Sequence, residues 1–213
     1  MRFNSLDELH LEGELDLPGE ASAAVVLCHP HPKMGGTMTA PLLLALRDDL
    51  VERGWAVLRF NFRGIGNSEG VSSTGELETE DAAGALDLMR ERRPDLPLAI
   101  AGWSFGGAVA VRVAAHDEAV VACAAIAPAV RAKPGVTDGL PPPESLGMGP
   151  PLLIVCGAND RVVEPADCRR WAGAVTAASY REISGANHFF WARYPKLCGT
   201  VGDFLDQALD PQR

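Results

Sequence analysis

The sequence predicts an α/β fold in which helices cover both faces of a mostly parallel central sheet. Short apolar runs alternate along the 213 residues with segments of helical character. Several of these runs are apolar at every position rather than at alternate positions, as expected of strands that helices bury on both sides. A chain of this length buries about 70 % of its unfolded surface, so we expect a single domain spanning 1–213.

The expected elements follow one another in the order of βαβ units. Leu11, Leu15 and Leu17 alternate with other residues and predict an antiparallel edge strand or hairpin before the parallel sheet. The apolar runs predict strands at 24–28, 56–61, 98–101, 120–126, 152–156 and 179–183. The segments between and after them predict helices at 41–52, 78–92, 106–115, 166–177 and 194–209.

Composition excludes several classes of partner. The chain is 47 % hydrophobic and 22 % charged, with a net charge of −9 and no run of basic residues longer than two, which argues against nucleic acid or an acidic membrane surface as a partner. The first residues lack the apolar core of a signal peptide, and no apolar stretch reaches membrane-spanning length. The five cysteines show no C-x-x-C spacing, so we expect reduced thiols and a cytoplasmic protein.

One segment, 129–150, is rich in proline and glycine and reads as a loop. It joins the fourth and fifth strands of the expected parallel sheet and is too short to form an independent domain. Two interpretations remain open, a mobile rim over a site and a plain surface connection. We name this segment the rim segment.

The most informative motif is Gly-Trp-Ser-Phe-Gly at 102–106, between the expected strand at 98–101 and the expected helix at 106–115. A strand-turn-helix carrying G-x-S-x-G is a nucleophile elbow. The turn is so sharp that side chains at the two glycine positions would collide with neighbouring backbone, while the serine hydroxyl is held exposed. Ser104 is therefore the expected nucleophile.

A serine hydroxyl needs a base to take its proton, and the elbow type supplies its partners in the chain order Ser, Asp or Glu, His. Of the two histidines after Ser104, His116 falls at the end of the helix that starts at the elbow, so we expect His188, in the loop after the last strand, to be the base. Asp160 ends an apolar strand at the edge where active-site groups of open α/β sheets gather, and we expect it to orient His188. Asp138 and Glu164 are the competing acids.

An oxyanion hole needs two backbone N–H groups, one of which we expect from Phe105, the residue after the nucleophile. The second should come from residues 29–32, His-Pro-His-Pro, after the strand at 24–28. Proline has no N–H, so only His29 and His31 can donate, and His31 lies further past the strand end. These two histidines have no carboxylate or cysteine at ligand spacing, so we expect no metal.

The remaining candidates concern substrate and cofactor. A G-x-G at Gly64–Gly66 follows a strand, but the third glycine falls one position too late for a dinucleotide fingerprint and no helix begins at the loop, so we expect no cofactor. Aromatic residues flank the expected triad, and of these Trp103 and Phe189 are expected to line an acyl or alcohol pocket. Packing in the core is the alternative role for both.

Taken together, these residues resemble the α/β-hydrolase superfamily and, within it, small bacterial serine hydrolases with a His-Pro-His-Pro loop. The matching segments are 29–32 with 35–38, 59–68, the elbow at 102–106, 157–160 and 187–189. The resemblance implies a mostly parallel sheet with Ser104, Asp160 and His188 as the triad. Many relatives have His-Gly where this chain has His29-Pro30, and a helical cap where it has only the rim segment, so no substantial cap domain is expected.

The resulting expectation is a serine hydrolase that cleaves short-chain carboxylic esters of small molecules through an acyl-enzyme. A peptidase or thioesterase with the same triad, and a non-catalytic binding module that keeps the fold, are the alternatives. The sequence does not predict the oligomeric state.

Overall fold

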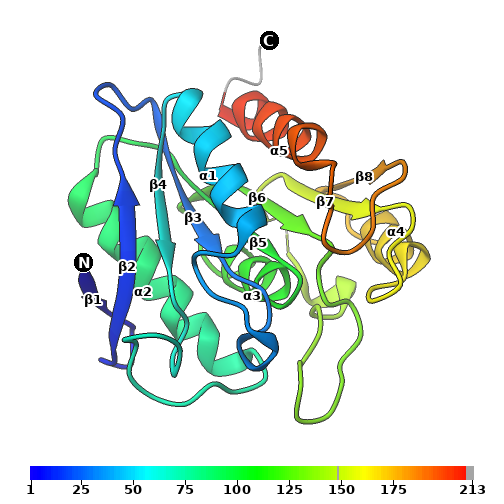
Figure 1. The fold of residues 1–213 in the computed structure, drawn as a ribbon, viewed down its shortest axis with the longest axis horizontal. Helices are drawn as coiled ribbons and strands as arrows, with labels where there is room; N and C mark the ends of the chain where they lie inside the picture. The colour runs from blue at the N-terminus through cyan, green and yellow to red at the C-terminus, as the bar shows by residue number, and fades with distance from the viewer. Residues whose placement is uncertain (148, 210–213) are drawn as a thin grey trace.

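The computed structural model of the chain describes residues 1–147 and 149–209, and its centre is an eight-stranded sheet (Figure 1). The strands lie side by side in the order β1-β2-β4-β3-β5-β6-β7-β8. Their bounds are β1 Arg2–Asn4, β2 His10–Asp16, β3 Ala23–Cys28, β4 Trp55–Phe60, β5 Leu98–Trp103, β6 Val120–Ile126, β7 Leu152–Gly157 and β8 Ala178–Ile183. From β4 to β8 all neighbours are parallel, whereas β2 pairs antiparallel with both β1 and β4.

Five α-helices cover the two faces of this sheet (Figure 1). They are α1 Pro41–Glu52, α2 Glu76–Arg92, α3 Phe105–Ala114, α4 Pro165–Gly173 and α5 Tyr194–Leu209. Helices α1 and α5 pack together in one apolar cluster, and α2, α3 and α4 contribute to a second cluster on the other face. Parallel strands connected by crossover helices bring the carboxyl ends of β3 to β8 to one edge, where the functional loops begin.

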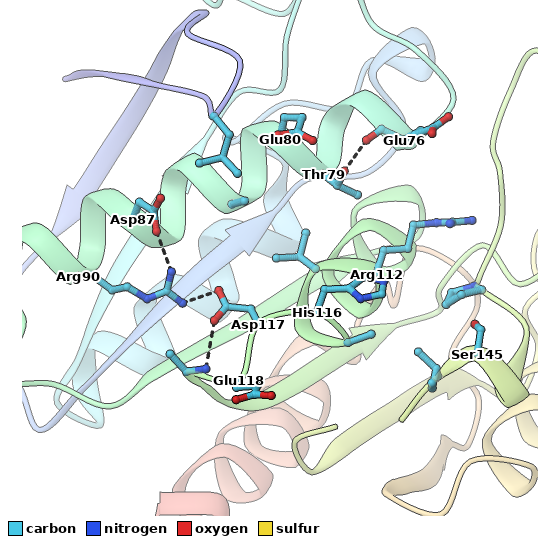
Figure 2. Close-up of a pocket in the computed structure, with 17 residues that line it drawn as sticks. Glu76, Thr79, Glu80, Asp87, Arg90, Arg112, His116, Asp117, Glu118 and Ser145 are labelled. Atoms are coloured by element: carbon cyan, nitrogen blue, oxygen red, sulfur yellow. Dashed lines mark hydrogen bonds and ion pairs between the residues drawn. The ribbon is translucent and has the colours of Figure 1, made fainter. Parts of the chain in front are cut away.

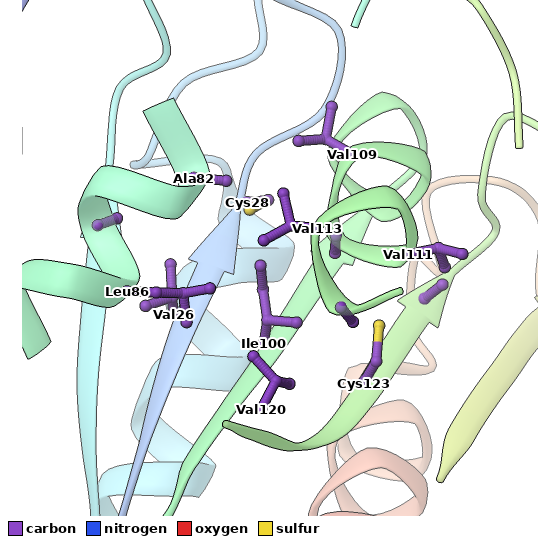
Figure 3. Packing of buried hydrophobic residues seen from close by; sticks show 14 of the residues in the cluster. Val26, Cys28, Ala82, Leu86, Ile100, Val109, Val111, Val113, Val120 and Cys123 are labelled. Carbon is purple, nitrogen blue, oxygen red and sulfur yellow. The ribbon is translucent and has the colours of Figure 1, made fainter. Parts of the chain in front are cut away.

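The core explains why so many strand residues are apolar at consecutive positions. Val26 of β3 and Ile100 of β5 face α2 and α3, where Leu86 and Val113 lie nearby (Figure 3). The intervening strand residues, such as Val25, lie in the cluster on the α1 and α5 face. Every position of β3, β4, β5 and β7 is buried, so each face of these strands must be apolar or internally paired.

The predicted fold class is confirmed, and the differences are local. The alternating segment pairs as predicted in an antiparallel hairpin, but the outer edge is the three-residue strand β1, and Leu17 falls beyond β2 and is exposed. The helix predicted for 166–177 ends at Gly173, because the chain then turns through Ala174 into β8. Among the described residues, no helix is both long and apolar enough to cross a membrane.

Candidate active site

The turn between β5 and α3 has the geometry of a nucleophile elbow. Ser104 has φ 57° and ψ −113°, a conformation that non-glycine residues rarely adopt and that costs of order 1–3 kcal/mol. A Cβ on Gly102 would lie 2.2 Å from the carbonyl oxygen of Gly106, and one on Gly106 would lie 2.4 Å from the carbonyl oxygens of Cys28 and His29. Both glycines are therefore required by space, and they let the elbow approach the end of β3.

Three side chains from distant parts of the sequence meet at this turn. His188 Nε2 lies 3.1 Å from Ser104 Oγ, and His188 Nδ1 lies 2.7 Å from Asp160 Oδ2. The other carboxylate oxygen, Asp160 Oδ1, accepts the backbone N–H groups of Val162 and Val163 at 2.8 and 2.9 Å. Because a carboxylate only accepts, this arrangement puts a proton on Nδ1 and leaves Nε2 free to accept the proton of the serine hydroxyl.

The loop that carries His188 is held in place by contacts that no sequence motif predicts. The indole N–H of Trp103 donates to the carbonyl oxygen of His188 at 3.1 Å, and the N–H of Asn159 donates to that of Ala186 at 2.8 Å. A Cβ on Gly157 would lie 2.6 and 2.7 Å from the carbonyl oxygens of the two residues that precede His188. The end of β7 and the His188 loop therefore touch backbone to backbone, which only glycine allows at this position.

The two residues expected to supply the oxyanion donors, Phe105 and His31, line the same cavity as Ser104. Within the part of the chain that the structure describes, no protein group accepts a hydrogen bond from the backbone N–H of Phe105 or His31. The imidazole of His31 is fixed at both nitrogens: Nδ1 accepts the N–H of Lys33 at 3.1 Å, and Nε2–H donates to Val136 O at 2.9 Å. The His31 ring thus joins the loop after β3 to the rim segment.

His29 has a structural role in the same loop. Its ring is buried, Nε2 accepts the N–H of Phe62 at 3.0 Å, and Nδ1–H donates to Pro30 O at 2.6 Å. Burial lowers the pKa of the His29 imidazole to about 4, so the ring is neutral near pH 7. Among the described residues there is no group of three or more His, Cys, Asp or Glu side chains arranged to hold a metal.

A cavity of about 400 Å³ opens beside the nucleophile. Ser104, Phe105 and His31 line it, together with residues of the rim segment between 129 and 137 and of the turn at 162–167. The rim segment therefore borders the site rather than being a remote connection. Residue 148 of this segment lies outside the described residues.

The two aromatic residues expected to bind substrate both lie beside His188. Trp103 is buried and its ring centroid lies 5.9 Å from that of His188, while Phe189 is partly exposed with its ring centroid 5.5 Å from that of His188. Neither belongs to the lining of the cavity at Ser104. Of the competing acids, Asp138 accepts hydrogen bonds from the Thr74 hydroxyl and the backbone N–H of Glu76, and Glu164 lies in the cavity lining.

A larger cavity, of about 740 Å³, lies between α2, α3 and the end of the rim segment (Figure 2). His116 lines it, which places this histidine away from the elbow hydroxyl as the sequence predicts. Its two arginines are already engaged: Arg90 pairs with Asp87 and Asp117, and Arg112 donates to carbonyl oxygens of the rim segment. No member of the Ser104 triad lines this second cavity.

Comparison with known proteins shows the family to which the chain belongs. Residues 19–150, which contain the elbow and the His-Pro-His-Pro loop, match the model of a hydrolase family described as serine aminopeptidase, S33. The chain belongs to this family of α/β hydrolases. The match ends before Asp160 and His188, so the second half of the proposed triad rests on the geometry above.

Three relatives show how far the similarity extends. An uncharacterized protein of Rickettsia prowazekii (strain Madrid E) is 30 % identical over 192 residues, which are 87 % of this chain and 79 % of the relative. An α/β serine hydrolase homologue from Coxiella burnetii is 30 % identical with a TM-score of 0.84 over 95 % of each chain. A serine hydrolase without lid from Xanthomonas campestris is 26 % identical, with a TM-score of 0.83 over 97 % of this chain and 93 % of its own.

These findings confirm the predicted superfamily and the α/β-hydrolase fold without a lid. The narrower grouping by a His-Pro-His-Pro loop stays a prediction. Sequence reasoning missed Gly157 and the imidazole of His31. Gly157 ends an apolar strand, but nothing in the sequence says which loop approaches it. The His31 imidazole was considered only as a metal ligand, and not as the group that ties its loop to the rim segment.

Proposed function

We propose that this protein is a serine hydrolase that cleaves carboxylic esters through an acyl-enzyme. The observation that carries the proposal is the continuous contact from Ser104 Oγ through His188 to the buried carboxylate of Asp160. A hydroxyl beside an imidazole that a carboxylate orients is the arrangement that makes serine a nucleophile near neutral pH.

In the proposed reaction, Ser104 Oγ attacks the ester carbonyl carbon while His188 Nε2 takes the hydroxyl proton. The carbonyl oxygen gains the negative charge and accepts hydrogen bonds from the backbone N–H groups of Phe105 and His31. Collapse of this intermediate breaks the bond to the alcohol, which leaves with the proton that His188 gives back. Water then repeats the sequence and releases the acid, while Asp160 orients the imidazole and stabilises its charged form.

Known magnitudes indicate what each part contributes. Proton transfer by a positioned base contributes about 10²–10⁴-fold, and one oxyanion donor contributes about 2.7–4 kcal/mol. Both terms depend on fixed geometry, and here the His31 loop is fixed by its imidazole and the His188 loop by Trp103 and Gly157. The site is thus preorganised on both sides of the nucleophile.

The residues that line the cavity favour esters over aminoacyl amides, the substrates of an aminopeptidase. An aminopeptidase needs a free carboxylate for the amino terminus of its substrate. Of the two carboxylates in the cavity lining, Asp167 is bound by Arg131 at 2.5 Å and by Arg170 at 2.9 Å, and Glu164 is exposed to water. A paired or hydrated carboxylate adds little to the binding of an ammonium group. A preference for short acyl chains stays a prediction, because a cavity of about 400 Å³ has room for longer ones as well.

The test uses p-nitrophenyl acetate and butyrate. We expect the wild-type protein to hydrolyse both and to be labelled by a fluorophosphonate, and we expect Ser104→Ala to lose turnover and labelling. Ser145→Ala, a serine of the second cavity, is the matched control and should behave as wild type. Undiminished turnover by Ser104→Ala, or the absence of a serine adduct in the wild type, contradicts the proposal. Faster turnover of aminoacyl p-nitroanilides than of esters favours the peptidase instead.

A further inference from the structure

The loop that follows His188 exposes two aromatic side chains in a way that packing alone does not explain. Phe189 is 40 % exposed and Trp191 is 65 % exposed, and they are the two aromatic members of the exposed large apolar side chains in the described chain. Their rings stack with centroids 4.9 Å apart and an interplanar angle of 15°. Phe190, between them, is fully buried. The result is a flat apolar surface open to solvent, which we name the aromatic platform (Phe189 and Trp191).

The backbone holds this platform in a strained conformation. Phe190 has φ 52° and Ala192 has φ 58°, both in the left-handed region that residues with a Cβ avoid. Two successive turns fix them, because Phe190 N–H donates to Asn187 O at 3.1 Å and Arg193 N–H donates to Phe190 O at 2.9 Å. Strain of this kind persists where the surrounding structure imposes it, and it gathers at ligand-binding sites.

The platform begins beside the proposed base. The ring of Phe189 stands edge-on to the ring of His188, with centroids 5.5 Å apart and an interplanar angle of 87°. His188 Nε2 faces Ser104 Oγ, so the alcohol oxygen must lie at Nε2 when it receives the proton on leaving. The rest of the alcohol therefore extends from the neighbourhood of the His188 ring, where the platform is.

The other half of the substrate has a separate place. The cavity beside Ser104 is lined by His31, Phe105 and the rim segment on the oxyanion side, and neither Phe189 nor Trp191 contributes to it. A cavity on the oxyanion side suits the acyl chain, and an open surface on the His188 side suits the alcohol. The two surfaces divide the ester at its carbonyl carbon.

We propose that the aromatic platform binds the alcohol part of the ester, and that this protein prefers alcohols that carry a planar apolar ring. The inference rests on the proposed ester hydrolysis and deepens it. A ring on the alcohol stacks on Trp191 during acylation, and the contact is lost when the alcohol leaves. The platform therefore acts on acylation and not on hydrolysis of the acyl-enzyme.

The test compares benzyl acetate with methyl acetate, which share an acyl group and both release an alkyl alcohol. Trp191→Ala should lower kcat/KM for benzyl acetate by about three- to tenfold, the range for one lost aromatic pair, and leave methyl acetate unchanged. Trp191→Phe keeps a ring and should stay near wild type. Leu17→Ala removes another exposed apolar side chain, just after β2 near the opposite edge of the sheet, and should leave both rates unchanged.

A second readout does not depend on turnover of the test esters. Inhibition by benzyl alcohol, measured with p-nitrophenyl acetate as substrate, should weaken about three- to tenfold in Trp191→Ala and remain in Leu17→Ala. Phe189→Ala is a poorer probe, because the ring of Phe189 also touches His188 and its loss can slow every ester.

The two levels of the proposal fail differently. If Trp191→Ala lowers both esters equally, or leaves both the ratio and the inhibition unchanged, the platform is not an alcohol subsite, and ester hydrolysis stands. If the wild-type protein hydrolyses none of these esters and takes up no fluorophosphonate, the proposed function fails and the platform proposal with it.

Discussion

Gly157→Ala is the substitution that most directly tests how the proposed triad is held together. Gly157 ends β7, three residues before Asp160, and the backbone that leads to His188 crosses directly over it. A Cβ at this position would lie 2.6 Å from the carbonyl oxygen of Ala186, whereas ordinary contact begins at 3.4 Å. The two loops must therefore separate by up to 0.8 Å to accept one methyl group.

That displacement decides the catalytic effect. Moving His188 straight away from Ser104 by 0.8 Å would stretch the 3.1 Å contact between Nε2 and Oγ to 3.9 Å, which is no longer a hydrogen bond. Misplacement of a catalytic group by about 1 Å costs about 10²-fold in rate. We expect Gly157→Ala to lose between ten- and a hundredfold in kcat, since the loop can absorb part of the shift. Overpacking should also lower the free energy of unfolding by about 1–3 kcal/mol.

The assay measures kcat for p-nitrophenyl acetate and the urea midpoint of unfolding on the same preparations. Gly199→Ala is the matched control, because Gly199 lies inside α5 with nothing within 4 Å of its added Cβ. It should keep full activity and gain about 0.5–1 kcal/mol of stability, as alanine does in a helix. A folded Gly157→Ala protein with wild-type kcat would refute the claim that backbone contact at this glycine sets the position of His188.

Two further predictions concern the carboxylate and the buried imidazole. Asp160→Asn should lower kcat by about 10⁴-fold, the loss seen for this change in another serine hydrolase, with little effect on the urea midpoint. The amide oxygen must stay on the two backbone N–H groups that hold Asp160 Oδ1 in the wild type, so the NH₂ group faces His188 Nδ1. The proton of the imidazole then moves to Nε2, which can no longer act as the base. An unchanged kcat would contradict this role of Asp160. His29 predicts a loss of stability in acid: its folded pKa of about 4 lies below the ordinary 6.5, so its contribution of about 3 kcal/mol is complete above pH 6.5 and is lost as the pH falls towards 4. The free energy of unfolding, measured with urea at pH 7 and pH 4.5, should fall less for His29→Gln than for wild type. Equal decreases would show that burial of His29 does not contribute to the pH dependence of stability.

The sequence predicted the fold well because the physical signals were local and repeated. Short, fully apolar runs such as 152–156 are typical of strands covered on both sides, and the helices at 41–52 and 194–209 begin and end where the structure has them. The helix at 166–177 was predicted too long, because small residues after Gly173 continue the helical pattern while the chain must turn back to reach β8. Three-residue β1 has too short a pattern to be recognised.

The site was predictable only where a motif or the chain order carried it. The elbow around Ser104 and the order of its partners led to Asp160 and His188, which the structure brings together. The contacts that hold them depend on which loops meet in space, and no local pattern encodes that. For the same reason the sequence could not say on which side of the nucleophile Trp103 and Phe189 lie; the structure places both around His188 and outside the lining of the cavity at Ser104, and their contact with substrate stays a prediction.

The strand order explains why the base and the aromatic platform share one loop. His31 follows β3, which lies next to β5 and its nucleophile, and Asp160 follows β7, which lies next to β8. His188 follows β8, three strands away from β5, or about 14 Å at the usual strand spacing. The loop must therefore fold back across the end of β7 to bring its imidazole to Ser104.

A loop that folds back in this way has an inner and an outer side. Its inner side touches Gly157 and Trp103 and buries Phe190, which anchors the return. Its outer side then faces solvent beside the base, and that is where Phe189 and Trp191 stack. The crossing that delivers the base to the nucleophile thus also creates the surface beside the leaving group. A change that shifts the backbone of this loop should therefore alter turnover and alcohol preference together, whereas a change in the part of the rim segment that lines the Ser104 cavity, 129–137, should alter acyl preference alone.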